Sequence, residues 1–78
     1  MKKFIRAGIV GAGMMGRNHT EALRRLPGVE VVALADPNST LAQRTCEDLF
    51  IPGYYASYQE MIEKENLDVV HVCTPNFA

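Results

Sequence analysis

The sequence has no excess of charge of either sign and no long apolar run. Its 78 residues include 8 lysine and arginine residues against 9 aspartate and glutamate residues, for a formal net charge of −1. A protein that binds nucleic acid usually carries a basic excess, and a helix that crosses a bilayer needs about 20 consecutive apolar residues. Neither feature is present, so we expect neither nucleic acid nor a membrane as a partner.

Signals for export and for metal binding are also missing. The first five residues begin like a secretion signal, but Arg6 and Gly8 interrupt the apolar run before it reaches signal length. The sequence has two cysteines, Cys46 and Cys73, and their separation does not match the spacing of metal ligands. We therefore expect a cytoplasmic protein without a metal site, in which both thiols are reduced and serve in packing.

The chain is short for an independent domain. A chain of about 60 residues buries only about 60% of its unfolded surface, which leaves a lone core marginally stable. The sequence also ends at Asn76-Phe77-Ala78 without a closing helix. We therefore interpret residues 1–78 as the front part of a larger protein.

Glycine spacing gives the most informative signal in the chain. Gly11-Ala12-Gly13-Met14-Met15-Gly16 follows the apolar pair Ile9-Val10 and opens a segment with helical periodicity. In a strand-to-helix turn of this kind, Gly11 allows a sharp turn, Gly13 lets a pyrophosphate approach the backbone, and Gly16 lets the helix pack closely. The start of the helix then offers free N–H groups to the phosphates. Glycines at such turns also occur for packing alone, and the motif by itself leaves that alternative open.

An acidic residue at the expected distance supports the nucleotide interpretation. Residues 29–35 have the pattern of a buried strand that ends at Asp36, twenty positions after Gly16. At about this spacing a dinucleotide-binding fold places the acid that binds the adenosine ribose hydroxyls. The alternative role for Asp36 is a turn or a helix cap before residues 37–39. A carboxylate here favours NAD over NADP, since a 2′-phosphate would meet a like charge and the next arginine, Arg44, is two helical turns away.

Two other nucleotide sites share part of this motif. Gly11 and Gly16 also have the spacing of a Walker A loop, but Arg17-Asn18 stands where that loop needs a lysine and a hydroxyl residue. A nucleoside triphosphatase is therefore not predicted. A flavin site has the same glycines, and they do not exclude it.

Strand and helix patterns alternate along the chain. We predict strands over residues 4–10, 29–35, 54–55 and 68–73, and helices over residues 14–26, 39–49 and 57–65. Alternation with right-handed crossovers gives an α/β fold: a Rossmann-type doubly wound parallel sheet, here truncated to four strands in the order 3-2-1-4. Ligands of such sheets bind at the carboxyl ends of the strands, where the strand order reverses. The glycine motif and residues 74–76 therefore belong to one cleft.

The helical segments carry further signals. Ser57 and Glu60 form a capping box at the start of the third predicted helix. In the first predicted helix, His19 lies on the apolar stripe that we expect to face the sheet, which predicts a packing role with one buried hydrogen bond. His71, in the middle of the last predicted strand, is also expected to be structural. The residues of the stripe are Met15, His19, Ala22, Leu23 and Leu26.

Three stretches of the sequence together resemble the Gfo/Idh/MocA oxidoreductases, a family that includes inositol and other sugar or polyol dehydrogenases. They are residues 11–19 with the pattern G-x-G-x-x-G-x-x-H, residues 36–38, and residues 68–76, which end in T-P-N. The resemblance spans nearly the whole chain. It implies an N-terminal Rossmann domain, followed by a C-terminal α/β domain that holds the substrate and often mediates oligomers.

The resemblance also implies roles for the residues after the last predicted strand. In relatives the T-P-N segment lies along the nicotinamide half of the cofactor, and we carry that role to Thr74, Pro75 and Asn76, with Cys73 beside them. The family's usual histidine after T-P-N, its catalytic lysine in an E-K-P segment and its acid–histidine pair would all lie beyond Ala78. No catalytic residue can therefore be named in this chain.

These observations predict that residues 1–78 form the N-terminal portion of an NAD(P)-binding Rossmann domain, without the substrate domain. We expect an NAD-dependent dehydrogenase that transfers hydride between nicotinamide and a sugar, polyol or related hydroxyl substrate. The fragment alone is expected to be inactive and to self-associate through the edge of its last strand, and the whole protein is expected to be a homo-oligomer. A non-catalytic dinucleotide-binding module or redox-sensing regulator is the alternative. The predicted cofactor-binding residues are Gly11, Gly13, Met14, Met15, Gly16, Asp36, Cys73, Thr74, Pro75 and Asn76.

Overall fold

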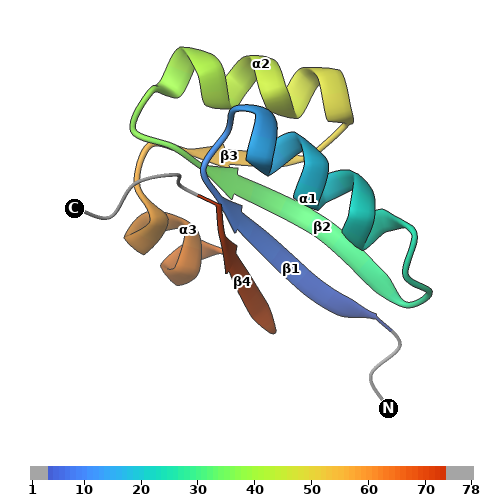
Figure 1. The fold of residues 1–78 in the computed structure, drawn as a ribbon. Coiled ribbons are helices and arrows are strands. Elements are labelled where there is room, and N and C mark those ends of the chain that lie inside the picture. The colour runs from blue at the N-terminus through green and yellow to red at the C-terminus, as the bar shows by residue number, and fades with distance from the viewer. Residues whose placement is uncertain (1–3, 74–78) are drawn as a thin grey trace.

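The computed structural model describes residues 4–73, in which strands and helices alternate along the chain (Figure 1). The elements are β1 (Ile5–Val10), α1 (Met14–Arg24), β2 (Val29–Ala35), α2 (Ser39–Leu49), β3 (Gly53–Tyr55), α3 (Tyr58–Lys64) and β4 (Val69–Val72). Every predicted element is present. The longest helices have 11 residues, and within residues 4–73 no helix is long and apolar enough to cross a membrane.

Four parallel strands form one sheet in the order β3-β2-β1-β4, which confirms the predicted order. β1 is central because it pairs with β2 on one side and with β4 on the other, so that Gly8 lies opposite both Ala33 and Val70. The chain crosses from one edge of the sheet to the other between β3 and β4. The carboxyl ends of β1 and β4 therefore lie side by side, at the reversal of strand order where such sheets bind ligands.

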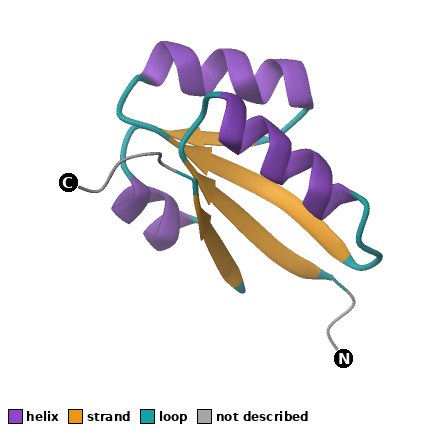
Figure 2. Cartoon of the chain, viewed as in Figure 1, coloured by secondary structure: helices purple, strands orange, loops and turns teal. Residues whose placement is uncertain are grey.

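The helices cover both faces of the sheet: α1 and α2 lie on one face and α3 lies on the other (Figure 2). Each face has its own apolar core. The core under α1 and α2 contains the buried residues Ala7, Ile9, Ala12, Val31, Leu34, Ala42, Cys46, Ile51 and Cys73. The core under α3 contains the buried residues Val32, Ala33, Ala35 and Met61. The central strands thus contribute to both cores, as expected of strands in a doubly covered parallel sheet.

A register shift in β2 explains how its residues divide between the two cores. Ala7 of β1 pairs with Val31, but the next residue, Gly8, pairs with Ala33, so Val32 is an extra residue on β2. Side chains on a regular strand alternate between faces, which would put Val31 and Leu34 on opposite faces. The irregularity lets both pack in the core under α1 and α2.

The face that α1 turns toward the sheet differs from the prediction. Of the predicted stripe only Leu23 is partly buried, whereas Met15 and His19 are exposed; Gly16 and Thr20 are the buried positions of the helix. The reason is Gly16: a Cβ atom there would lie 2.1 Å from the carbonyl oxygen of Gly11. This close approach fixes the rotation of the helix, and the buried positions then follow from Gly16 at helical spacing.

Hydrogen bonds explain where α1 ends and where α3 begins. The N–H groups of Arg25 and Leu26 donate to carbonyls three residues earlier, which tightens the last turn of α1 and ends the α-helix at Arg24, two residues before the predicted end. At α3, Ser57 Oγ accepts from Glu60 N at 3.1 Å, which confirms the serine half of the capping box. The Glu60 carboxylate pairs with Lys64 at 3.1 Å, one turn further on.

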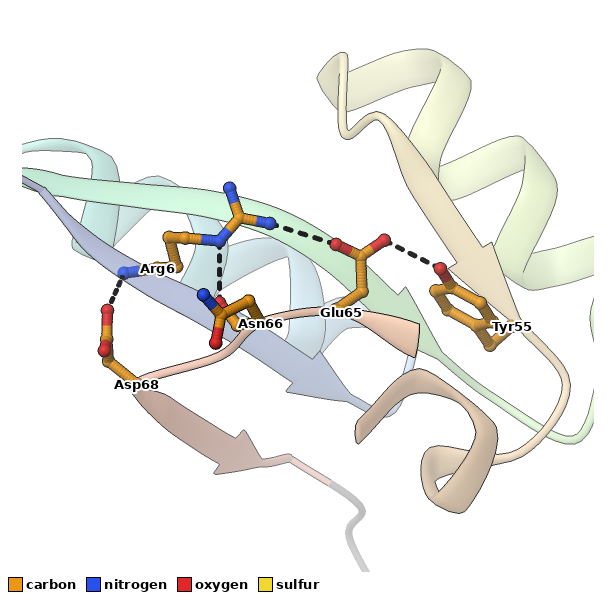
Figure 3. Close-up of polar contacts among 5 residues, drawn as sticks. All are labelled: Arg6, Tyr55, Glu65, Asn66 and Asp68. Atoms are coloured by element: carbon orange, nitrogen blue, oxygen red, sulfur yellow. Dashed lines mark hydrogen bonds and ion pairs between the residues drawn. The ribbon is translucent and has the colours of Figure 1, made fainter. Parts of the chain in front are cut away.

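A polar cluster ties the start of β1 to the segment between α3 and β4 (Figure 3). The Arg6 side chain donates from Nε to the Asn66 carbonyl at 2.7 Å and from Nη2 to Glu65 Oε1 at 3.1 Å. Glu65 Oε2 accepts from the Tyr55 hydroxyl at 2.7 Å. The Arg6 backbone adds two bonds, since its N–H donates to Asp68 Oδ2 and its carbonyl accepts from Asp68 N, both at 2.8 Å. These contacts fix the position at which β4 joins β1.

Candidate functional site

A hollow of about 380 Å³ lies where β1 and β2 end and α1 begins. It is lined by the glycine loop and the start of α1 (Gly11–Gly16), by Asp36 after β2, by Leu41 of α2 and by Cys73 after β4. Every predicted cofactor-binding residue within residues 4–73 is among these. The predicted residues Thr74, Pro75 and Asn76 lie outside the described residues. The structure thus brings together residues from Gly11 to Cys73, which lie 62 positions apart in the sequence.

Two residues of the hollow were missed by the sequence prediction. The G-x-G pattern specifies the glycines on either side of Ala12 but not Ala12 itself. Helical periodicity predicts that Leu41 lies on the inner face of α2, but it does not predict that Leu41 lines a binding site. The spacing between Asn38 and Leu41 could have indicated this position, because Asn38 caps α2 by accepting from Leu41 N at 3.0 Å and so holds the first turn of the helix beside Asp36.

Each glycine of the motif meets a different requirement. Gly11 has φ 111°, a conformation that L-residues with a side chain rarely adopt, and it turns the chain sharply from β1 into α1. Gly16 is required because a Cβ atom at this position would collide with the Gly11 carbonyl oxygen. A Cβ atom on Gly13 would have no neighbouring atom within 4 Å. Gly13 is therefore not needed for packing, and the open space beside it is where the prediction places the pyrophosphate.

The N-terminus of α1 presents backbone donors to this space. The helix begins after Gly13, which has no side chain to cap it, and its first turn contains no acidic residue. The first hydrogen bond within the helix runs from Arg17 N to the Gly13 carbonyl at 3.0 Å. The N–H groups of Met14, Met15 and Gly16 precede that bond and have no acceptor within the helix. Together with the helix dipole, they suit an anionic group.

The Asp36 carboxylate is held between the glycine loop and the start of α2. Its Oδ2 accepts from Ala12 N at 2.9 Å, and its Oδ1 accepts from Asn38 N at 2.8 Å. The second contact is the turn that the sequence offered as an alternative role for Asp36, and the structure confirms it. The helix cap is Asn38 and not Asp36. Binding of ribose hydroxyls by Asp36 stays a prediction, and the carboxylate lines the hollow as that prediction requires.

Both cysteines are free and buried, which confirms their predicted role in packing. Burial raises the pKa of the Cys46 thiol to about 11 and also raises the pKa of the Cys73 thiol. Both groups are therefore neutral thiols near pH 7. Cys73 N donates to the Val10 carbonyl at 2.7 Å, which extends the pairing of β1 and β4 and brings Cys73 to the wall of the hollow.

The two histidines are neighbours. The prediction that His19 is buried is wrong: its side chain is exposed, and its Nδ1 lies 3.1 Å from the Met15 carbonyl oxygen within α1. The half-buried His71 of β4 lies on the same side of the sheet, with its ring centroid 6.1 Å from that of His19. Neither histidine lines the hollow beside the glycine loop.

Comparisons with known proteins show which family this chain resembles. A family model described as "Oxidoreductase family, NAD-binding Rossmann fold" matches residues 5–78. The trans-1,2-dihydrobenzene-1,2-diol dehydrogenase of Danio rerio is 40% identical over 72 residues, which cover 90% of this chain and 22% of that protein. The alpha-N-acetylgalactosaminidase of Shewanella oneidensis is 30% identical over 80 residues, which cover 91% of this chain and 17% of that protein.

A solved structure shows the same fold. The myo-inositol dehydrogenase of Lactobacillus casei, in complex with NAD(H) and myo-inositol, superposes with a TM-score of 0.83 at 28% identity. The match covers 92% of this chain and 22% of that one. The chain therefore spans about a fifth of the length of the relatives that it matches.

Proposed function

The chain belongs to the Gfo/Idh/MocA family of oxidoreductases with an NAD-binding Rossmann fold, and we propose that it is the N-terminal, dinucleotide-binding part of an NAD-dependent dehydrogenase. The reaction would be hydride transfer between nicotinamide and a sugar, polyol or related hydroxyl substrate. A C-terminal domain would hold the substrate and mediate a homo-oligomer. The observation that carries the proposal is the meeting of the glycine loop, Asp36 and Cys73 around one hollow at the carboxyl ends of the strands.

The residues around the hollow fit the parts of NAD. The open space beside Gly13 and the free N–H groups at the start of α1 would receive the pyrophosphate. The Asp36 carboxylate would accept hydrogen bonds from the adenosine ribose hydroxyls. Residues 73–76 would follow the nicotinamide half, with the buried Cys73 as the first of them. NAD supplies the hydride acceptor when it is bound, and this chain supplies its binding and orientation.

We expect the Asp36 carboxylate to give the full-length protein a preference for NAD over NADP. Each charge-assisted hydrogen bond to a ribose hydroxyl is worth about 1.5–3 kcal/mol, whereas the 2′-phosphate of NADP would meet the carboxylate at close range. We expect the full-length protein to bind NAD at least about tenfold more tightly than NADP. Isothermal titration calorimetry with both cofactors measures this ratio. Equal or tighter binding of NADP would contradict the assignment of Asp36.

The test of the proposed function is turnover by the full-length protein. NADH formation would be followed by absorbance in the presence of NAD and a panel of inositols, sugars and other polyols. A substrate-dependent rise in NADH supports the dehydrogenase. Binding of NAD without turnover on any member of the panel would favour the non-catalytic module or redox-sensing regulator.

A second candidate reaction comes from the likeness to the Shewanella oneidensis alpha-N-acetylgalactosaminidase. That relative is named for hydrolysis, so this likeness supports a glycosidase whose N-terminal part still binds NAD. The same protein would be assayed for release of a chromophore from aryl N-acetylgalactosaminides. Hydrolysis without net NADH formation would favour the glycosidase over the dehydrogenase.

A further inference from the structure

Two consecutive amides of the glycine loop are held by two consecutive residues at the end of β2. Gly11 N donates to the Ala35 carbonyl at 2.8 Å, and Ala12 N donates to Asp36 Oδ2 at 2.9 Å. The first contact continues the backbone pairing of β1 with β2. The second is made by a side chain, and it reaches the loop one residue before Gly13. The position of the loop at Gly13 therefore depends on the Asp36 carboxylate.

Two further hydrogen bonds hold Asp36 in place, one to its carboxylate and one from its backbone. Its second oxygen, Oδ1, accepts from Asn38 N at 2.8 Å, and the Asp36 N–H donates to the Tyr55 carbonyl at 3.0 Å. An ionised carboxylate has about four lone-pair positions, and the protein uses one on each oxygen. One position on each oxygen remains for a ribose hydroxyl. Holding the loop and binding the ribose are therefore compatible roles for one side chain.

The Ala12 N–H depends on the Asp36 carboxylate as its hydrogen-bond acceptor. The residue is buried, with 2% of its surface exposed, and its N–H would be left without an acceptor if the carboxylate were removed. An unpaired backbone N–H in a buried position is unfavourable, so the peptide would turn toward solvent and carry Gly13 with it. The space beside Gly13, which the proposed pyrophosphate site requires, would then change shape.

We propose that Asp36 is a positioning residue for the pyrophosphate site, acting through Ala12, in addition to binding the adenosine ribose. The inference rests on the proposed binding of NAD. Asp36 should therefore affect the binding even of ligands that lack the hydroxyls of the adenosine ribose. The charge alone would act in the opposite direction, since a carboxylate repels a nearby pyrophosphate and its removal would tighten binding.

The test uses the full-length protein and two ligands: NAD, and NAD whose adenosine ribose lacks the 2′ and 3′ hydroxyls. Titration calorimetry gives the affinity of wild type and Asp36→Ala for each. We expect Asp36→Ala to bind the dideoxy analogue about tenfold more weakly than wild type does, although this ligand cannot use the ribose contact. Asp36→Asn, which has one oxygen to share between Ala12 and Asn38, should show a smaller loss in the same direction.

Glu21→Ala is the matched control, because it also removes a carboxylate but from an exposed position of α1 that does not line the hollow. It should bind the analogue as wild type does, and circular dichroism should show all variants folded. If Asp36→Ala does not fold, the comparison of Asp36→Asn with wild type decides. Equal or tighter binding of the analogue by the Asp36 variants would overturn the positioning role while NAD binding by wild type stands. Failure of wild type to bind NAD would overturn the proposed function itself.

Discussion

Two threonines show at the level of single residues how burial and hydrogen bonding combine in this fold. Thr20 of α1 and Thr45 of α2 are both fully buried. The Thr20 hydroxyl donates to the Gly16 carbonyl at 2.8 Å, one turn earlier in the helix. The Thr45 hydroxyl has no hydrogen-bond partner among the described residues. A buried hydroxyl without a partner loses its hydration and gains nothing in return.

Thr45→Val should therefore stabilise the protein. Valine has nearly the same shape and the same β-branching, so the change removes the unpaired hydroxyl without opening a cavity. We expect a gain of about 1 kcal/mol in the free energy of unfolding, measured by urea denaturation. Thr20→Val is the control, since it removes a hydroxyl that is hydrogen-bonded, and it should not be stabilising. A loss of stability in Thr45→Val comparable to that in Thr20→Val would contradict this account.

Individual residues also show what the sequence could predict. The roles of Gly11 and Gly16 were predictable because each follows from local geometry at a strand-to-helix turn. The exposure of His19 was not, because the rotation of α1 depends on how closely Gly16 approaches Gly11, and periodicity among weakly apolar residues does not measure that distance. The bond between Asp36 and Ala12 was also beyond prediction, because it requires the relative positions of two loops.

At the scale of elements, the strand order was predictable because strand–helix alternation and right-handed crossovers allow few arrangements. The cluster that holds β4 was not predictable. It joins Arg6 of β1, Tyr55 of β3 and Glu65 after α3, and no local pattern relates these positions (Figure 3). The hydrogen bond to Glu65 is the main cause that raises the pKa of Tyr55 to about 12; burial and the charges of Glu65 and Glu60 add to it.

This cluster predicts a loss of stability at alkaline pH. The ordinary pKa of tyrosine is 10, so the folded state retains the Tyr55 proton at a pH where the unfolded state releases it. The contribution of Tyr55 is complete below about pH 10 and is lost as the pH rises from about 10 to about 12. Tyr55→Phe should lose less stability over this range than wild type, as measured by urea denaturation at each pH.

An absorbance titration that follows tyrosine ionisation tests whether Glu65 causes the raised pKa of Tyr55. In Glu65→Ala both the hydrogen-bond acceptor and the charge are gone, so the pKa of Tyr55 should fall toward its ordinary value and one tyrosine should titrate earlier than in wild type. Tyr54→Phe is the control, because the Tyr54 side chain is outside the cluster. An unchanged titration in Glu65→Ala would show that Glu65 does not raise this pKa.

At the scale of the whole molecule, β4 is an edge strand of the described sheet. Its valines are partly exposed, with 39% of Val69, 37% of Val70 and 57% of Val72 accessible. An apolar edge with unpaired N–H and C=O groups is a template for pairing with another strand, and β4 itself carries no lysine or proline to prevent it. These features are consistent with the predicted self-association.

We therefore expect the 78-residue chain, prepared by itself, to form dimers or larger species through β4. Size-exclusion chromatography with light scattering measures the mass in solution. Val72→Lys places a charge on this edge and should shift the chain toward monomer, whereas Phe50→Lys changes an even more exposed apolar residue away from β4 and should not. A wild-type chain that remains monomeric at high micromolar concentration would contradict the role of the edge.

We propose that the glycine loop holds the pyrophosphate of NAD, and Gly13→Val in the full-length protein is the sharpest test of this role. A Cβ atom at this position has no neighbouring atom within 4 Å, and the side chain would fill the space proposed for the phosphates. We predict that titration calorimetry detects no NAD binding to Gly13→Val while circular dichroism matches wild type. Glu21→Val, at an exposed position two turns along α1, should bind NAD normally. Binding by Gly13→Val within a few-fold of wild type would show that this loop is not the cofactor site.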